Sequence, residues 1–447
     1  MPTEQVVLRL RGIRADLVTG AVVGGLTFAV YLLGAGRNYD YDSSQTVGTF
    51  IATRSLLDPF RRQTVFNNHP LLSFLDHLVY SAGWHSPSGL RVLPIFFGAV
   101  AVALVTAWAA RCWGILAGAC AGVLLAANPA FAFYSRAVRG YSLVTLSALA
   151  STLLVAYLLR SEGRLASVAY VIAAAAGVAT HLYAVFPLVA QAAAIVARGG
   201  FSRRWAARFV TALTLGALAY VHIGVGMIEA AHRQTHHFRP HFPLALASTL
   251  LGGANIPIAA SGVLLVLGFA ALWRRETIAV ALTLAAAIAV IWLWLQPLDL
   301  YPRFLVWLVA AIALAASAAV GRWPAAALLV YTAVVPLAVI DARHWTQNPL
   351  PDRQAAQLVV DARTHGARPC VLPWVRGSLL AYTKAPPEVT RAQDLVRCDF
   401  VIGNPADSRS LRRAARRELP YDWVLTANTP FLVFSRLQRA TLLHRRA

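Results

Sequence analysis

Apolar segments close to the roughly 20 residues that cross a bilayer recur along this chain from residue 16 to residue 340. Hydrophobic residues make up 58% of the 447 residues and charged residues only 13%, which is too little charge to cover a soluble surface of this size. The sequence therefore predicts a multi-pass α-helical membrane protein. About eleven transmembrane helices are expected, at residues 16–35, 89–110, 115–133, 141–159, 166–182, 183–197, 209–227, 256–273, 277–296, 303–320 and 324–340.

The charge of the chain is strongly basic, with 40 basic and 19 acidic residues and a net charge of +21. The basic residues lie in short gaps between apolar segments, a pattern typical of membrane topology and anionic lipid rather than of a nucleic-acid-binding face. If the N-terminus is inside, the predicted inner segments hold thirteen arginines and the short outer loops hold five. We therefore expect a cell-membrane protein with a cytoplasmic N-terminus and an extracytoplasmic C-terminus.

The chain divides into two predicted domains. Residues 1–340 form a transmembrane module whose first outer loop, 36–88, is too long for a simple connector. The apolar pattern of this loop predicts two short interfacial helices, near 43–57 and 69–82. Residues 341–447 read as a small soluble α/β domain on the outer side.

The expected elements of the C-terminal domain alternate between two types. Helices are predicted at 353–364 and 405–418, and strands at 370–373, 400–403, 423–426 and 431–434. Cys370 and Cys398 both fall in this domain, where an oxidising compartment permits a disulfide, but their separation in sequence leaves the pairing open. No internal repeat supports the inverted symmetry of a secondary transporter.

An acidic motif, Asn38-Tyr39-Asp40-Tyr41-Asp42-Ser43, directly follows the first membrane segment on the outer side. A carboxylate there can act as a general base, and two carboxylates at i and i+2 influence each other's titration. The alternative interpretation is a solvated loop beside the membrane. Asp42 and Asp40 are the candidate catalytic residues.

A second motif, Asn67-Asn68-His69-Pro70, lies later in the same loop. Two amides and an imidazole offer donors and acceptors for sugar hydroxyls, and Pro70 fits the first position of the helix that follows. A helix cap explains the same residues equally well. His69 with Asp42 leaves a divalent cation open, but no metal-ligand spacing supports one, so no metal site is predicted.

Arginines at the outer ends of several membrane segments form the third candidate feature. Arg136 and Arg139 precede Tyr141 and the fourth segment, while Arg91 and Arg303 enter two others. A guanidinium at the outer interface is suited to clamp a phosphate through paired donors. Snorkelling of the side chains to lipid headgroups is the alternative.

The ordered set of motifs resembles the GT-C superfamily of integral-membrane glycosyltransferases, which use polyprenyl-phosphate-linked sugars. The likeness is greatest to the branch of protein O-mannosyltransferases, aminoarabinose transferases and galacturonosyltransferase-like proteins. The matching residues are Tyr41-Asp42-Ser43, Asn67-Asn68-His69-Pro70, Arg91-Val92-Leu93-Pro94 and Tyr134-Ser135-Arg136-Ala137-Val138-Arg139-Gly140-Tyr141. Ser43 stands where the family has a Glu, so a carboxylate pair here would have to use Asp40.

This resemblance implies an inverting transfer of a monosaccharide from a polyprenyl-phosphate donor to a hydroxyl of a cell-envelope acceptor. Asp42, with Asp40 second, would take the acceptor proton. Asn67, Asn68, His69, Arg91, Arg136, Arg139, Tyr141 and Arg303 would bind substrate. The alternatives are a polyprenyl-lipid flippase or transporter, which would need charges within its spans, and a non-catalytic membrane assembly partner. No cofactor other than the open divalent cation is expected, and membrane lipid is an expected partner.

Overall fold

The computed structural model describes residues 3–61, 68–198, 200–224, 226, 242–253, 255–272, 301–347, 352–371, 379–384, 386–387, 397–403, 422–428 and 432–437. These residues fall into two compact units. The first comprises Met1–Ala35 and Ser55–Gln347, and the second comprises Gly36–Arg54 and Asn348–Ala447. The second unit thus combines the beginning of the segment between α1 (Thr3–Leu32) and α5 (Pro87–Trp113) with the C-terminal region.

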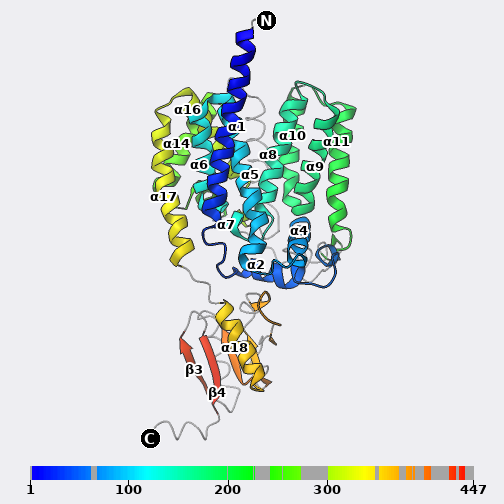
Figure 1. The fold of residues 1–447 in the computed structure, drawn as a ribbon, viewed down its shortest axis with the longest axis vertical. Helices are drawn as coiled ribbons and strands as arrows, with labels where there is room; N and C mark the ends of the chain where they lie inside the picture. The colour runs from blue at the N-terminus through cyan, green and yellow to red at the C-terminus, as the bar shows by residue number, and fades with distance from the viewer. Residues whose placement is uncertain are drawn as a thin grey trace. The chain divides into compact units, whose positions relative to one another are not determined.

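The first unit is a bundle of helices (Figure 1). Its helices, in chain order, are α1 (Thr3–Leu32), α3 (Asp58–Arg61), α4 (Pro70–Ser81), α5 (Pro87–Trp113), α6 (Ile115–Ala127), α7 (Pro129–Arg136), α8 (Tyr141–Leu158), α9 (Arg164–Thr180), η2 (Leu182–Ala184), α10 (Val185–Ala197), α11 (Arg203–Ala217), η3 (Leu218–Tyr220), α13 (Phe242–Leu251), α14 (Asn255–Leu272), η4 (Pro302–Leu305), α16 (Leu308–Arg322) and α17 (Ala326–Gln347).

The bundle packs in two groups around α5. Helix α5 contacts α1, α6 and α8; α8 packs against α9, and α9 packs against α11. Helices α14, α16 and α17 form the other group, which reaches α5 through α6 and α16. Large apolar side chains remain exposed along the outer faces of these helices, as lipid-facing surfaces require. Examples are Leu17, Leu26, Val266 and Leu328.

The protein is a multi-pass membrane protein, as its apolar segments predict. Among the described residues, five helices are long and apolar enough to cross a bilayer, and a bent pair would make six. Three further apolar helices are shorter, at Arg164–Thr180, Leu182–Ala197 and Leu308–Arg322. The predicted segment 277–296 lies outside the described residues.

The predicted single helix at 115–133 is wrong, because the structure breaks it into α6 and α7 at an angle of 65°. Asn128 ends α6 and caps α7, its side chain accepting a hydrogen bond of 3.1 Å from the Phe131 N–H. Pro129 follows at the first helical position, where a missing N–H costs nothing, whereas inside a continuous helix it would clash with the preceding turn. The break directs α7, and with it Arg136, away from the line of α6.

The second unit contains a short helix, a helical turn and an α/β region. Helix α2 (Tyr41–Thr46) runs directly into the π-helical turn η1 (Val47–Ile51). Helical structure thus ends at Ile51, earlier than the predicted boundary at residue 57. Helix α18 (Asp352–Thr364) matches the prediction at 353–364, whereas the predicted helix at 405–418 lies outside the described residues.

Four strands form one mixed sheet in the order β1-β2-β4-β3. They are β1 (Pro369–Val371), β2 (Phe400–Gly403), β3 (Asp422–Asn428) and β4 (Leu432–Leu437), each close to a predicted strand. Strand β1 runs parallel to β2, and β4 pairs antiparallel with both β2 and β3. The core beneath this sheet consists of Ala356, Val359, Val371, Leu379 and Ile402, with Tyr382 packed against it.

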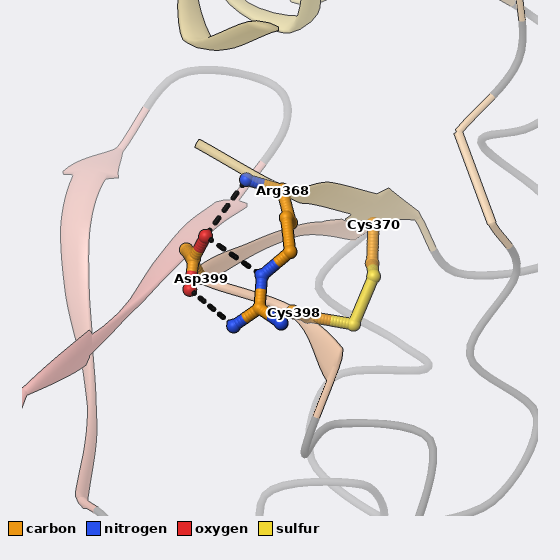
Figure 2. Close-up of a disulfide and its surroundings, with 4 residues drawn as sticks. All are labelled: Arg368, Cys370, Cys398 and Asp399. Atoms are coloured by element: carbon orange, nitrogen blue, oxygen red, sulfur yellow. Dashed lines mark hydrogen bonds and ion pairs between the residues drawn. A yellow bond between two sulfur atoms is a disulfide. The ribbon is translucent and has the colours of Figure 1, made fainter. Parts of the chain in front are cut away.

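A disulfide joins Cys370 of β1 to Cys398, just before β2, so the pairing that the sequence left open is formed (Figure 2). Beside it, the Arg368 guanidinium contacts the Asp399 carboxylate, with Nη2 3.1 Å from Oδ1. The Arg368 N–H also donates to Asp399 Oδ2 at 2.8 Å. A disulfide and an ion pair therefore both connect the parallel strands β1 and β2.

Candidate functional site

His69 is the centre of the candidate site in the first unit. It is the residue before α4, and Pro70 occupies the first helical position as predicted. The imidazole is buried, and neither nitrogen has a hydrogen-bond partner among the described residues. Its ring lies edge-on to Tyr141 at 4.8 Å and tilted to His181 at 5.0 Å. Burying an imidazole whose nitrogens make no hydrogen bond is unfavourable, so it is a group that a ligand can satisfy.

Gly140 allows His69 to approach this closely. A Cβ at position 140 would stand 2.9 Å from His69 Nδ1 and 2.2 Å from the Thr180 methyl carbon. Gly140 and Tyr141, at the beginning of α8, therefore pack directly against the imidazole. A side chain larger than hydrogen at position 140 would displace the ring.

Two arginines act on both histidines of this site. Burial lowers the pKa of both the His69 ring and the His181 ring, and the positive charges of Arg139 and Arg303 lower it further. Arg139 is buried, and Arg303 is half-buried with its guanidinium 4.5 Å from the Tyr301 ring centre. The arrangement gathers side chains from four separate parts of the chain. We call His69, Arg139, Tyr141, His181 and Arg303 the arginine–histidine cluster.

The electrostatics of the cluster favour a bound anion. Burial lowers the pKa of His69 well below its usual value, and the charges of Arg139, His181 and Arg303 lower that pKa further. The imidazole is therefore neutral at physiological pH, while the guanidinium groups keep their charge. The cluster presents two fixed positive charges and two neutral rings, a combination suited to a phosphate and its sugar.

His181 is a member of the cluster that the sequence did not single out. It occupies the break between α9 and η2, where its Nδ1 accepts a hydrogen bond of 3.2 Å from the Tyr183 N–H. In the neutral ring the proton must then reside on Nε2, which is left as a donor. Its ring also lies 5.2 Å from Phe304, beside Arg303. The sequence feature that could have identified His181 was its position at a break between two short apolar segments.

Two of the predicted substrate-binding residues, Asn68 and Arg91, make contacts within the local structure. The Asn68 amide donates to Pro59 O at 2.6 Å, and its oxygen accepts from the Ser73 hydroxyl at 2.9 Å. Arg91 donates from Nη1 to Ala35 O at 2.6 Å, at the end of the first membrane segment. These two side chains therefore stabilise local structure within the first unit through hydrogen bonds. Asn67 lies outside the described residues.

Arg136 differs from Arg139 in its surroundings, although the two are only three residues apart. Its guanidinium forms an ion pair with Asp341 and lies 4.7 Å from the Tyr31 ring centre. Its Nε also donates to Ala132 O at 3.0 Å. The charge of Arg136 is therefore compensated by a carboxylate from α17, and the residue links α1, α7 and α17.

The two candidate catalytic acids lie in the second unit and have different roles in its local structure. Asp40 is the N-cap of α2, because its side chain accepts from the Ser43 N–H at 3.0 Å and from the Ser43 hydroxyl at 2.6 Å. Asp42 is in the first turn of the same helix and is half-buried. Ser43 is thus the partner of Asp40.

The open question of a divalent cation receives no support from side-chain grouping. In the part of the chain that the structure describes, no three His, Cys, Asp or Glu side chains gather as metal ligands.

Asp76, in the middle of α4, is a buried carboxyl outside the cluster. Its side chain is fully buried, and neither oxygen has a hydrogen-bond partner among the described residues. Burial raises its pKa well above the usual 3.8. The carboxyl of the folded protein therefore stays protonated at pH values at which the same carboxyl is ionised in the unfolded chain. The contribution of this group to stability is present below pH 3.8 and is lost as the pH rises toward its folded pKa.

We expect Asp76→Asn to become more stable relative to the wild type as the pH rises above the usual carboxyl pKa of 3.8 toward the raised pKa of the folded state. Asn has the same shape and no titration, whereas the wild type loses up to about 1.4 kcal/mol per pH unit within the window. Thermal unfolding of the two detergent-solubilised proteins at several pH values measures this. Glu162→Gln, which removes an exposed carboxyl, is the control. A constant difference between Asp76→Asn and wild type across the range would contradict the prediction.

The structure as a whole is similar to solved membrane glycosyltransferases. ArnT from Cupriavidus metallidurans, bound to undecaprenyl phosphate, matches with a TM-score of 0.64 and 13% identity over 98% of this chain and 99% of that chain. The oligosaccharyltransferase of Archaeoglobus fulgidus matches with a TM-score of 0.56 and 13% identity over 95% and 74%. Arabinofuranosyltransferase AftD from Mycobacteria matches at 0.52 and 16% over 94% and 40%.

At these identities the likeness establishes a shared fold. The chain has the GT-C fold, as its motifs and apolar segments predicted. No protein-family model matches the sequence, and no curated protein matches it.

Proposed function

We propose that the protein transfers a monosaccharide from a polyprenyl-phosphate donor to a hydroxyl group of a cell-envelope glycan, lipid or protein. The observation that carries the proposal is the packing of the buried His69 ring against Tyr141 and His181, with Arg139 and Arg303 adjoining the residues in contact, in a fold shared with glycosyltransferases. One of those structures, ArnT, holds undecaprenyl phosphate. A lipid-linked phosphate fits the charge of the cluster, and its isoprenoid chain fits a membrane bundle.

In the proposed reaction the acceptor hydroxyl oxygen attacks the anomeric carbon of the donor sugar. The bond between that carbon and the phosphate oxygen breaks with inversion, and the lipid phosphate leaves with the bonding electron pair. Asp42 takes the hydroxyl proton as general base. Arg139 and Arg303 stabilise the negative charge that grows on the departing phosphate, which is the larger electrostatic requirement of the step. The Nε2–H of His181 and the His69 ring supply neutral hydrogen-bonding groups for the same oxygens or for the sugar.

The proposal is tested with purified protein and a panel of radiolabelled polyprenyl-phosphate sugars, incubated with a cell-envelope fraction and followed by product analysis. The expected result is transfer of one sugar, which is lost in Asp42→Asn. A protein that binds polyprenyl phosphate but transfers nothing, and whose cellular phenotype survives Asp42→Asn, would support an assembly partner. Movement of unmodified lipid between leaflets of vesicles, without transfer, would support a flippase.

His181 is predicted to contribute through its Nε2 donor rather than through its cap on the backbone. Gln places an amide N–H near the position of Nε2, whereas Asn preserves only the acceptor near Nδ1. We expect His181→Asn to weaken donor-lipid binding by about 10-fold or more and His181→Gln to retain most of it, the loss being that of a charge-assisted hydrogen bond.

Binding of undecaprenyl phosphate to the detergent-solubilised variants measures this difference. His85→Asn, at an exposed histidine of the first outer loop, is the matched control. Full binding by His181→Asn would assign His181 a purely structural role as the cap of η2.

The orientation is also part of the proposal, with the N-terminus in the cytoplasm and the C-terminal region outside. The excess of arginine in the predicted inner segments supports it, as does the Cys370–Cys398 disulfide, which an oxidising compartment preserves. Reporter fusions at Arg204 and Ala447 should give opposite signals, with the fusion at Ala447 active only as an extracytoplasmic reporter. A cytoplasmic signal at Ala447 would overturn the orientation.

A further inference from the structure

The segment that carries Asp40 and Asp42 is fastened to the C-terminal region within the second unit. The hydroxyl oxygen of Tyr382 accepts a hydrogen bond of 2.7 Å from the Tyr39 N–H, and the two rings lie 5.7 Å apart. The Ala381 N–H donates to the Ser44 hydroxyl at 3.2 Å. One contact precedes the acidic pair in sequence and the other follows it.

Gly48, one helical turn after Ser44, also contacts the C-terminal region. A Cβ at this position would stand 2.3 Å from Leu380 O and 2.4 Å from Leu380 C, so the two backbones touch. No side chain other than hydrogen fits there unless one backbone moves. Three consecutive residues, Leu380, Ala381 and Tyr382, therefore contact three positions spread over the segment 39–48.

These three residues are themselves fixed by the core of the C-terminal region. Tyr382 packs against the core formed by α18, β1 and β2, which includes Val359, Val371 and Ile402. Leu379, the residue before the contact, is fully buried in the same core. The disulfide and the Arg368–Asp399 contact hold β1 beside β2 (Figure 2). Residues 380–382 are therefore anchored in a packed and cross-linked core where they contact residues 39–48.

We propose that residues 380–382 are a brace that positions the Asp42 carboxylate for proton removal, with Tyr382 and Gly48 as positioning residues. The inference rests on the proposed function for the role of Asp42, but the brace itself rests on the three contacts. It assigns the C-terminal region a part in catalysis. The helical segment formed by α2 and η1 ends at Ile51 and is too short to be stable by itself, so contacts from outside it must hold the Asp42 carboxylate in place.

The first test measures the brace without reference to sugar transfer. Hydrogen exchange is followed by mass spectrometry for the peptide covering residues 36–46 in the full-length, detergent-solubilised protein. Tyr382→Phe keeps the ring but removes the acceptor of the Tyr39 N–H, so exchange in this peptide should accelerate about 3- to 10-fold. Tyr331→Phe, at an exposed tyrosine of α17, should leave it unchanged.

The second test measures positioning. Gly48→Ala forces the Leu380 backbone away, whereas Gly36→Ala, in the same segment, adds a methyl group into open space. We expect Gly48→Ala to lower kcat about 10- to 100-fold and Tyr382→Phe to lower it less, with donor-lipid binding unchanged in both. Gly36→Ala should resemble the wild type. If Gly48→Ala does not fold, Tyr382→Phe decides the point alone.

The outcomes separate the two ideas. Unchanged exchange in Tyr382→Phe would overturn the brace. Faster exchange with unchanged kcat would overturn its role in positioning Asp42. A wild-type protein that transfers no sugar would contradict the proposed function, while the exchange experiment would still decide whether residues 380–382 brace the segment.

Discussion

Replacing Asp42 by Asn is expected to reduce sugar transfer about 10²- to 10⁴-fold while leaving donor-lipid binding intact. The expected size is that of a general base, whose removal leaves the binding and electrostatic contributions in place. Asn keeps the shape of the side chain and its place in the first turn of α2. Single-turnover transfer by the purified variant, with binding measured in parallel, checks both halves of the prediction.

Asp40 offers a matched comparison two residues away. Its carboxylate caps α2, and Asn is as good an N-cap as Asp, so Asp40→Asn should keep the helix and most of the activity. Asp40→Ala should lose the cap, at a cost of about 1 kcal/mol in local stability. Near-normal transfer by Asp42→Asn with loss in Asp40→Asn would reverse the assignment of the base. Loss in both Asn variants would instead indicate a shared acidic pair.

Arg139→Ala is expected to weaken binding of the donor lipid by about 10- to 150-fold. Removing one charge-assisted contact to a phosphate costs roughly 1.5–3 kcal/mol. Arg139→Lys keeps the charge but loses the planar fork, so it should retain part of the affinity. The measurement compares undecaprenyl phosphate with undecaprenol, since a phosphate contact must affect the first ligand and not the second.

Arg136 provides the control for this experiment. Because Arg136 forms an ion pair with Asp341 and contacts Tyr31, we expect Arg136→Ala to lower the melting temperature. We expect the same variant to change the preference for undecaprenyl phosphate over undecaprenol very little. Equal affinity of Arg139→Ala and wild type for the phosphate ligand would mean that Arg139 has only a structural role. Arg303 would then be the principal phosphate ligand.

The sequence by itself determined the features that depend on local pattern. Apolar segments of bilayer length predicted a multi-pass helical protein, because lipid forces backbone groups to be satisfied within each crossing. Pro70 predicted the first residue of α4, and alternating apolar runs predicted the strands of the C-terminal region. Four short motifs in order predicted the GT-C fold, which the structural likeness bears out.

The tertiary structure alone decided which of these residues meet. Four outer arginines looked equivalent in the sequence, yet the structure places Arg139 and Arg303 by the histidines, Arg91 on a backbone carbonyl and Arg136 on a carboxylate. His181 joins the cluster from a break between two short helices, and Tyr382 reaches residue 39 across 343 positions of sequence. Periodicity reports only the face that a residue occupies on its own helix, whereas such contacts depend on how separate elements pack together.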